Sequence, residues 1–270
     1  MTFRPAIKGV IRFSYPADGG FAQDHTSEIA HEAFLYDGER LKRRFHLFEA
    51  LTLPSLRSQT DKDFSVAVLV GENLPDWARQ RLEEGISDIP QARIIPLPRM
   101  AHYPATRAAL EALPDAADAT HIAGFRLDDD DAMHKDTVAR IREIAHSVAP
   151  VTAPDKPFAI GFNRGAFLTL SKTGNRIEVV GERAPIGIGL TLVVPIDQRS
   201  NIFRRNHRLL HQFYDCFTDA NRLMFIRSVH EDNDSGAVNT GAPDKKISEA
   251  DLAAQIEEGF GLSLAQLKGL

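Results

Sequence analysis

Apolar residues recur along the first 150 residues in two alternating patterns. Short continuous runs, typical of strands buried on both faces, cover residues 9–14, 64–70, 93–97 and 121–127. Segments with apolar residues at three- and four-residue steps predict amphipathic helices at 39–58, from Pro75 through Ile86, at 106–113, and after Asp136. This alternation predicts a parallel sheet with right-handed crossovers and helices on both faces. We expect Pro54 to kink or end the first helix, and Asp136 to cap the last.

The pattern changes after Pro150. Partly alternating or apolar stretches predict strands of a mixed or antiparallel extension at 158–170, 177–180 and 187–194, and residues 225–229 are also β-like. Helices are expected at 206–217 and 220–225, a loop at 232–246, and a last helix beginning at Ser248 with Asp251 in a capping box. The predicted fold class is therefore α/β, a Rossmann-like mixed sheet with helices on both faces and a C-terminal helical segment.

Composition narrows the function classes. The chain has 270 residues, a formal net charge of −5 and one cysteine, Cys216. A net negative charge argues against nucleic acid as a partner, and one cysteine excludes both a disulfide framework and a cysteine-based metal site. The opening residues resemble no secretory signal, and no stretch approaches the about 18 apolar residues of a spanning helix. We expect a cytoplasmic protein without a transmembrane segment. The apolar residues 262–270 would pack on the domain, on a second subunit or peripherally on a membrane.

Four consecutive aspartates, Asp128–Asp131, follow the fourth predicted strand. Adjacent carboxylates repel one another unless a cation or solvent neutralises them, and ligands of parallel sheets bind at this edge. Carboxylate oxygens suit Mg²⁺ or Mn²⁺. If the backbone stays extended, Asp128 and Asp130 share one side and Asp129 and Asp131 the other. The alternative is a solvated acidic loop or a helix N-terminus.

A histidine and several arginines extend this candidate site. His230 would reach the metal from a distant part of the chain, the alternative being a surface histidine in a polar loop. Arg12, beside Tyr15, would hold a base or a phosphate, and Arg107 and Arg126 would bind a diphosphate or pair with an aspartate. The remaining helix arginines are more typical of a solvated face: Arg40, Arg43 and Arg44.

The segment Arg126–Ala132 resembles the metal motif of glycosyltransferases with the nucleotide-diphospho-sugar fold, called GT-A. Several stretches resemble, more narrowly, a rhamnosyltransferase family of bacteria. They are Arg12–Tyr15, Arg40–Phe45, Leu53–Leu56, Gln59–Asp61, Phe64 with Val68 and Leu69, Arg126–Ala132, and Val229 and His230 with Asn233. The resemblance covers about residues 9–235, and the combination is more specific than any single stretch.

The resemblance implies a metal-dependent transferase that moves a sugar from a nucleoside diphosphate to an acceptor hydroxyl. Residues 1–247 would form one GT-A domain, with a nucleotide-sugar half to about 150, an acceptor half from 151, and a tail at 248–270. The implied donor is an activated deoxysugar such as dTDP-rhamnose, and the acceptor is a glycan, lipid or protein. The implied cofactor is Mn²⁺ or Mg²⁺, with Asp128, Asp130 and His230 as ligands. The donor-binding candidates are Arg12, Tyr15, Glu72, Arg107, Arg126, Asp128 and Asp129.

Transfer also needs a carboxylate that removes the proton of the acceptor hydroxyl. The candidates are Asp215, Glu231, Asp232 and Glu182. One alternative function is a nucleotidyltransferase acting on sugar phosphates, which would carry a glycine-rich phosphate loop with a lysine. The segment Tyr15–Gly20 contains glycines but no lysine. The other alternative is a non-catalytic module that binds sugars or cations.

Overall fold

The computed structural model describes residues 2–18, 27–114, 116–231, 233, 241–244 and 246–270. Most of the predicted loop at 232–246, including the base candidate Asp232, lies outside these residues, as do Gly19 and Gly20.

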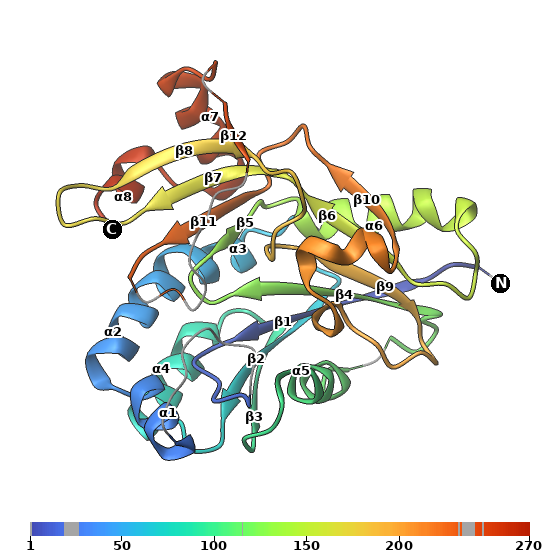
Figure 1. Cartoon of the computed structure of the whole chain (residues 1–270), viewed down its shortest axis with the longest axis horizontal. Helices are drawn as coiled ribbons and strands as arrows, with labels where there is room; N and C mark the ends of the chain where they lie inside the picture. Colours follow the sequence, from blue (N-terminus) through green and yellow to red (C-terminus); the bar gives the residue numbers. More distant parts are fainter. Residues whose placement is uncertain (1, 19–26, 115, 232, 234–240, 245) are drawn as a thin grey trace.

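A seven-stranded sheet with the order β10-β6-β9-β4-β1-β2-β3 forms the centre of the fold (Figure 1). The four strands predicted in the first half are parallel neighbours: β1 (Pro5–Arg12), β2 (Ser65–Gly71), β3 (Ala92–Leu97) and β4 (His121–Asp128). On the other side, β9 (Thr191–Pro195) runs antiparallel between β4 and β6 (Phe158–Phe162), and β10 (Asp215–Asp219) is parallel to β6. The predicted α/β class with a mixed sheet is confirmed.

Helices cover both faces of this sheet because its strands are apolar on both sides. Ile7 and Ile11 of β1 pack with one group of helices, whereas Val10, on the opposite side of the strand, packs with Ala105 and Ala109. The first group is α2 (Gly38–Leu47), α3 (Leu53–Arg57), α4 (Asp76–Ile86) and α6 (Thr137–Val148), and the opposite face carries α5 (His102–Glu111). The helix α1 (Glu28–Leu35), capped by Ser27, precedes α2, and a short 3-10 turn, η2 (Ala149–Val151), follows α6.

The helix predicted at 39–58 is interrupted by a π-helical turn, η1 (Phe48–Thr52), in which the Leu53 N–H donates to the Phe48 carbonyl. Pro54 has no N–H to continue the helix and lies in the first turn of α3 instead. The Thr52 hydroxyl donates to the Asp131 carbonyl at 2.9 Å. The π-helical turn is therefore tied directly to the aspartate run, in agreement with the frequent occurrence of such turns at functional sites.

A second, five-stranded sheet has the order β12-β8-β7-β11-β5. Its strands are β5 (Ala132–Met133), β7 (Arg164–Thr169), β8 (Arg176–Gly181), β11 (Phe225–Val229) and β12 (Ala242–Pro243). Because β5 directly follows the aspartates and pairs antiparallel with β11, the aspartate run connects the two sheets. Both sheets take strands from both sides of residue 150.

The C-terminal helical segment consists of α7 (Glu249–Phe260) and α8 (Leu264–Lys268). Ser248 caps α7 as predicted, since its hydroxyl oxygen accepts from the Asp251 N–H. Ile256, Phe260 and Leu267 pack against Leu168 and Ile226 of the second sheet. Among the described residues, no helix combines the length and the apolar character needed to cross a bilayer.

Three local predictions are wrong. Residues 206–217 form a 3-10 turn, η4 (His207–Gln212), which follows η3 (Ile202–Arg204), and then β10, because pairing with β6 overrides local helical preference. Residues 220–225 form a turn that leads into β11 instead of a helix. Asp136 occupies the N-cap position of α6 without a side-chain capping bond, and its carboxylate accepts from the Thr60 hydroxyl at 2.8 Å.

Candidate active site

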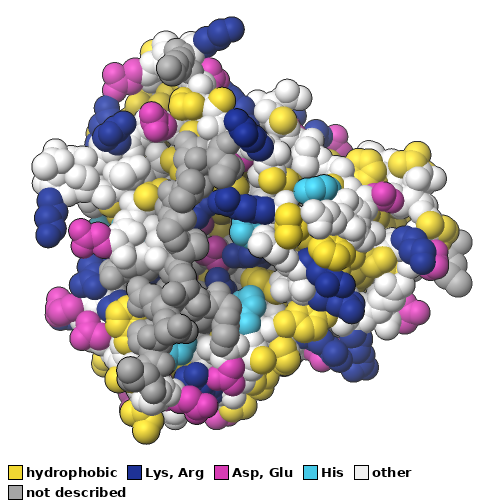
Figure 2. Space-filling view, in the orientation of Figure 1, with side chains coloured by type: hydrophobic (Ala, Val, Ile, Leu, Met, Phe, Trp, Pro, Cys, Tyr) yellow, Lys and Arg dark blue, Asp and Glu magenta, His cyan; other side chains and the backbone are white. Residues whose placement is uncertain are grey.

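A cavity of about 240 Å³ lies at the carboxyl ends of β1 and β4 and is closed on one side by β11. In Figure 2 the molecule is hollowed near the centre of the view, where Lys or Arg and His side chains gather. Among the described residues, five arginines and four aspartates line it. The complete lining is Arg12, Ser14, Tyr15, Leu35, Arg40, Arg44, His102, Arg126, Asp128, Asp129, Asp130, Asp131, His207, Arg227, Ser228 and Asn233.

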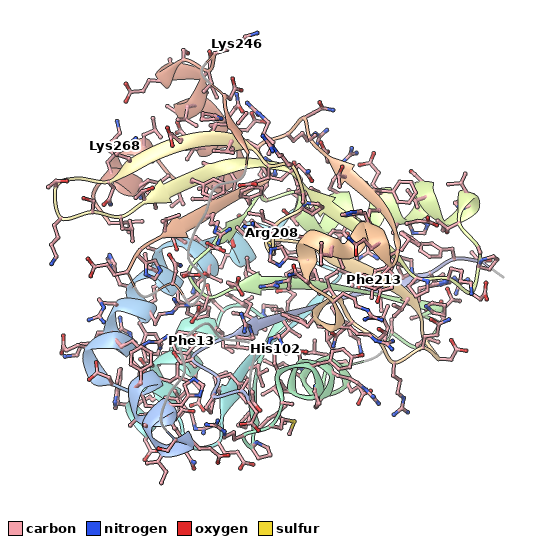
Figure 3. All side chains as sticks on the ribbon, in the orientation of Figure 1. Phe13, His102, Arg208, Phe213, Lys246 and Lys268 are labelled. Atoms are coloured by element: carbon pink, nitrogen blue, oxygen red, sulfur yellow. The ribbon has the colours of Figure 1, made fainter. Side chains whose placement is uncertain are left out.

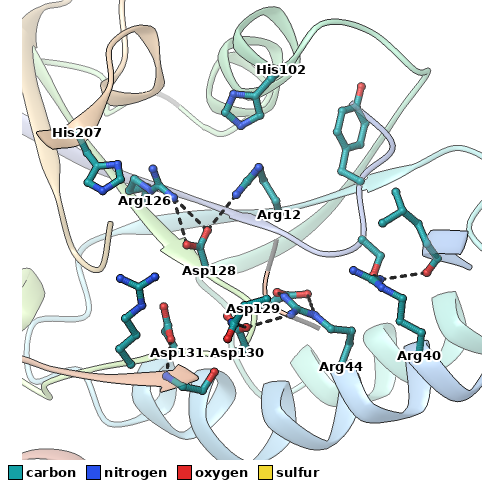
Figure 4. Close-up of a pocket in the computed structure, with 16 residues that line it drawn as sticks. Arg12, Arg40, Arg44, His102, Arg126, Asp128, Asp129, Asp130, Asp131 and His207 are labelled. Atoms are coloured by element: carbon teal, nitrogen blue, oxygen red, sulfur yellow. Dashed lines mark hydrogen bonds and ion pairs between the residues drawn. The ribbon is translucent and has the colours of Figure 1, made fainter. Parts of the chain in front are cut away.

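Asp128 lies between two arginines (Figure 4). Its Oδ1 accepts from Arg12 Nη2 at 3.3 Å, and its Oδ2 from Arg126 Nη2 at 3.1 Å. Burial by itself raises the pKa of Asp128, but the charges of Arg126 and Arg12 outweigh that effect and hold the pKa below its ordinary value. The Asp128 side chain is still 31% exposed toward the cavity, so it remains available to a ligand.

Gly187 makes room for the Arg126 side chain. A Cβ at position 187 would lie 2.8 Å from Arg126 Cζ, closer than real contacts allow. The guanidinium also lies over the Phe203 ring, 5.1 Å from its centre. Arg126 Nε is buried and has no hydrogen-bond partner within the described part of the chain. Arg126 is therefore held in place while one of its donors is unused.

Arg44 neutralises the next two aspartates. Asp129 is 1% exposed and pairs with Arg44 through both of its carboxylate oxygens. Asp130 Oδ2 accepts from Arg44 Nη1 at 3.0 Å and from the Asn233 side-chain amide at 3.1 Å. His230 Nε2 lies 2.9 Å from the same oxygen. Burial raises the pKa of Asp130, but Arg44 and His230 outweigh it, so the pKa is lowered overall.

The backbone turns at the aspartates, which corrects the expected alternation of their side chains. The strand β4 ends at Asp128, and the Asp131 N–H donates back to the Asp128 carbonyl at 3.4 Å. Asp131 is directed at the second sheet, where its Oδ1 accepts from the Ser228 N–H at 2.9 Å. Burial, with the nearby charges of Asp130 and Asp128, raises the pKa of Asp131 well above its ordinary value.

Two helix arginines that sequence reasoning assigned to a solvated face are buried in this site. Arg40 is 3% and Arg44 is 7% exposed. Arg40 Nη1 donates to Ser14 Oγ at 3.1 Å and to the Leu35 carbonyl at 3.3 Å. Ser14 has a φ of 47°, in the left-handed region that a non-glycine residue rarely adopts except where function needs it. The four-residue spacing, which puts both arginines on one helix face, was the available signal.

His102, at the start of α5, and His207, at the start of η4, also line the cavity, and sequence reasoning missed both (Figures 3 and 4). Burial first, and then the charges of Arg12 and Arg126, lower the pKa of His102 to about 3. Burial and Arg126 lower the pKa of His207 to about 4. Both imidazoles are neutral near pH 7. No local motif marks either histidine, because only the chain fold brings them to the strand ends.

Three of the predicted donor-binding residues have polar groups bonded outside the arginine–aspartate cluster: Tyr15, Glu72 and Arg107. Tyr15 lines the cavity, but its hydroxyl donates to the Pro98 carbonyl at 2.6 Å. Glu72 follows β2, and its carbonyl accepts from Arg79 at 3.0 Å. Arg107 is 41% exposed on α5 and pairs with Glu111 at 3.0 Å. Neither Glu72 nor Arg107 lines the cavity.

The three described candidates for the catalytic base lie in different parts of the structure. Asp215 begins β10, which runs in the same direction as β4, so it lies at the sheet edge opposite Asp128. Glu182 is buried, and its backbone pairs with Asn163, outside the cavity. Glu231 lines a second cavity, of about 760 Å³, together with His230. His230 therefore stands between this second cavity and the aspartates.

The predicted metal ligands are engaged with other groups. Asp128 accepts from two arginines, and Asp130 Oδ2 accepts from Arg44 and Asn233. His230 Nε2 lies 2.9 Å from Asp130 Oδ2 and 3.4 Å from the side-chain amide nitrogen of Asn233. Across the part of the chain that is described, no three His, Cys, Asp or Glu side chains are arranged to hold one ion. In this arrangement arginines of the chain compensate the charges of Asp128 and Asp130.

The sequence matches a protein family described as "Putative rhamnosyl transferase" over residues 6–242. The match covers most of the chain. The chain belongs to this family. The family description names an enzyme that transfers a sugar, and the chain is accordingly a glycosyltransferase.

Two crystal structures of S. aureus TarS 1-349 are also similar. The one in complex with UDP-GlcNAc matches with a TM-score of 0.49 and 11% identity, over 97% of this chain and 69% of TarS 1-349. The one in complex with UDP matches with a TM-score of 0.42 and 10% identity, over 83% of this chain and 60% of the other. No curated protein matches the sequence.

Proposed function

We propose that the protein transfers a sugar from a nucleoside-diphosphate donor, with the donor diphosphate bound in the arginine-lined cavity. The observation that carries the proposal is the convergence of Arg12, Arg126 and Asp128 at the carboxyl ends of neighbouring parallel strands. A guanidinium group can bind a phosphate through two parallel N–H···O hydrogen bonds. The carboxyl ends of the parallel strands are also where α/β folds of this kind bind nucleotides. Family membership supports the same activity and the GT-A assignment. Rhamnose is the sugar that the family description favours.

In the proposed reaction the acceptor hydroxyl oxygen attacks the anomeric carbon of the donor sugar. The bond from that carbon to the diphosphate oxygen breaks, and its electron pair leaves with the nucleoside diphosphate. The proton of the hydroxyl passes to a carboxylate. Glu231 is the described base candidate that we favour, because it follows His230 and lines the neighbouring cavity, where an acceptor would enter. Asp128, exposed toward the cavity, would accept from the donor ribose.

Two alternatives predict different products. A nucleotidyltransferase would release or consume pyrophosphate, whereas a binding module would release nothing. Incubation with dTDP-rhamnose and a panel of UDP-sugars, without acceptor, separates them, because a transferase slowly releases free nucleoside diphosphate by transfer to water. We expect release from one donor, and a loss of about a hundredfold or more in Arg126→Gln if that arginine supplies charge at the transition state. Arg107→Gln, outside the cavity, is the matched control. Pyrophosphate formation, or no release from any donor, would refute the transferase assignment.

A further inference from the structure

Arg227 is a cavity arginine whose charge acts on Asp128 and Asp131 but which forms no ion pair within the described residues. It lies in β11 and reaches the cavity from the five-stranded sheet, opposite the ends of β1 and β4. Its side chain is half-buried, and its Cζ lies 5.7 Å from the centre of the Phe167 ring. No ion pair joins it to any carboxylate in the described parts of the chain, whereas Arg12, Arg44 and Arg126 each bind an aspartate. A half-buried guanidinium of this kind is expected to have an anionic ligand.

Some buried polar atoms of the cavity wall are unsatisfied within the described residues. Arg126 Nε and Ser228 Oγ are buried and have no hydrogen-bond partner among the described residues. Ser228 is next to Arg227 and is 1% exposed. Leaving a buried donor unpaired is unfavourable, so such atoms commonly mark a binding site. Arg126 lies on the wall formed by β4, and Arg227 and Ser228 lie on the facing wall formed by β11, which suits a ligand rich in acceptor oxygens.

The aspartates, in contrast, already have their charge compensated. Arg44 compensates Asp129 and Asp130, and Asp128 holds Arg12 and Arg126. A divalent ion binding Asp128 or Asp130 would have to displace these guanidinium groups. Each arginine has five N–H donors, so Arg12 and Arg126 can hold Asp128 and still donate to phosphate oxygens.

We propose that Arg227, together with Arg12 and Arg126, neutralises the departing nucleoside diphosphate directly, and that sugar transfer proceeds without a bound divalent cation. This inference rests on the proposed function. As the bond from the anomeric carbon to the diphosphate oxygen breaks, the electron pair stays on the terminal phosphate, and guanidinium N–H groups from both sheets donate to it. Preorganised donors of this kind stabilise developing charge without reorganisation during the reaction.

The experiment measures calorimetric binding of UDP and dTDP, and of the matching monophosphates, to the wild type. One set contains EDTA and the other Mn²⁺. The same measurements follow on Arg227→Gln and on Arg176→Gln, an exposed arginine of β8 in the same sheet that loses the same charge away from the cavity. Arg227→Lys retains the charge without the paired donors. Thermal unfolding of each variant checks that it folds.

We expect a nucleoside diphosphate to bind equally well, within about threefold, in EDTA and in Mn²⁺. Arg227→Gln should weaken diphosphate binding about tenfold or more and change monophosphate binding less than about threefold. Arg176→Gln should bind both nucleotides like the wild type. Diphosphate binding that EDTA abolishes and Mn²⁺ restores overturns the inference but leaves the proposed function intact. Equal weakening by Arg227→Gln and Arg176→Gln also overturns it. If neither diphosphate nor any sugar-nucleotide binds in either condition, the proposed function itself fails.

Discussion

Arg12 and Asp128 are register partners on adjacent parallel strands, and their side chains join at 3.3 Å where both strands end. The pair is separated by 116 residues in the chain. It shows how the parallel sheet converts two distant sequence positions into one edge of a binding cavity. The charge balance of that edge leads to the first three of the predictions below.

Gly187→Ala should weaken nucleotide binding with little loss of stability. The added Cβ would lie 2.8 Å from Arg126 Cζ and would displace the guanidinium from Asp128. We expect UDP or dTDP affinity to fall about tenfold, which corresponds to about 1.4 kcal/mol. Gly181→Ala is the control, since a Cβ there meets nothing within 4 Å. Equal affinities in the two variants, measured by calorimetry, would contradict the packing of Gly187 against Arg126.

Stability should decrease on acidification because of His102 and His207. Their folded pKa values, about 3 and about 4, lie below the ordinary value of 6.5. The unfolded chain therefore takes up protons as pH falls below about 6.5, whereas the folded chain does so only near 3 to 4, so acid favours unfolding in this window. At about pH 5 the loss is on the order of 2 kcal/mol per histidine relative to pH 7.

Urea unfolding of His102→Asn at several pH values isolates this contribution. The variant should lose less stability than the wild type between pH 7 and about pH 5. His211→Asn, at an exposed position of η4, should retain the wild-type dependence. Parallel curves for wild type and His102→Asn would rule out a buried neutral imidazole at position 102.

Arg44→Gln should destabilise the fold strongly. It leaves Asp129, 1% exposed, and Asp130, 5% exposed, without their guanidinium partner. Breaking a buried ion pair on one side costs about 3–5 kcal/mol. Lys42→Gln, two residues away, removes an exposed pair with Glu39 and should cost less than about 1 kcal/mol. Chemical denaturation compares the two, and similar small losses would argue against compensation of the aspartates by Arg44.

Leu267→Ala tests whether the C-terminal segment belongs to the domain core. Leu267 has no exposed surface and packs with Phe260 and Ile226. We expect the free energy of unfolding to fall by about 2–5 kcal/mol, independently of protein concentration. Lys268→Ala, which removes only an exposed pair with Glu249, should cost less than about 1 kcal/mol. A concentration-dependent loss would instead place the segment in a contact between subunits.

The sequence predicted the four parallel strands and the sheet edge at which the cavity lies, because apolar runs and strand ends are local signals. It did not predict what neutralises the aspartates. Adjacent carboxylates are visible in sequence, but Arg44 lies 85 residues before Asp129, and its role depends on the packing of α2 against β4. The long-range pairing of β10 with β6 was likewise invisible to helical periodicity. The sequence therefore did not reveal that arginines from other elements compensate the charges of the aspartates.

The aspartate run joins β4 of the first sheet to the two-residue strand β5 of the second sheet. The two sheets form opposite walls of the cavity. A diphosphate bound by Arg126 on one wall and by Arg227 on the other would link the two sheets a second time. Nucleotide binding should then suppress local opening of both sheets, and amide hydrogen exchange in β4 and β11 should slow together.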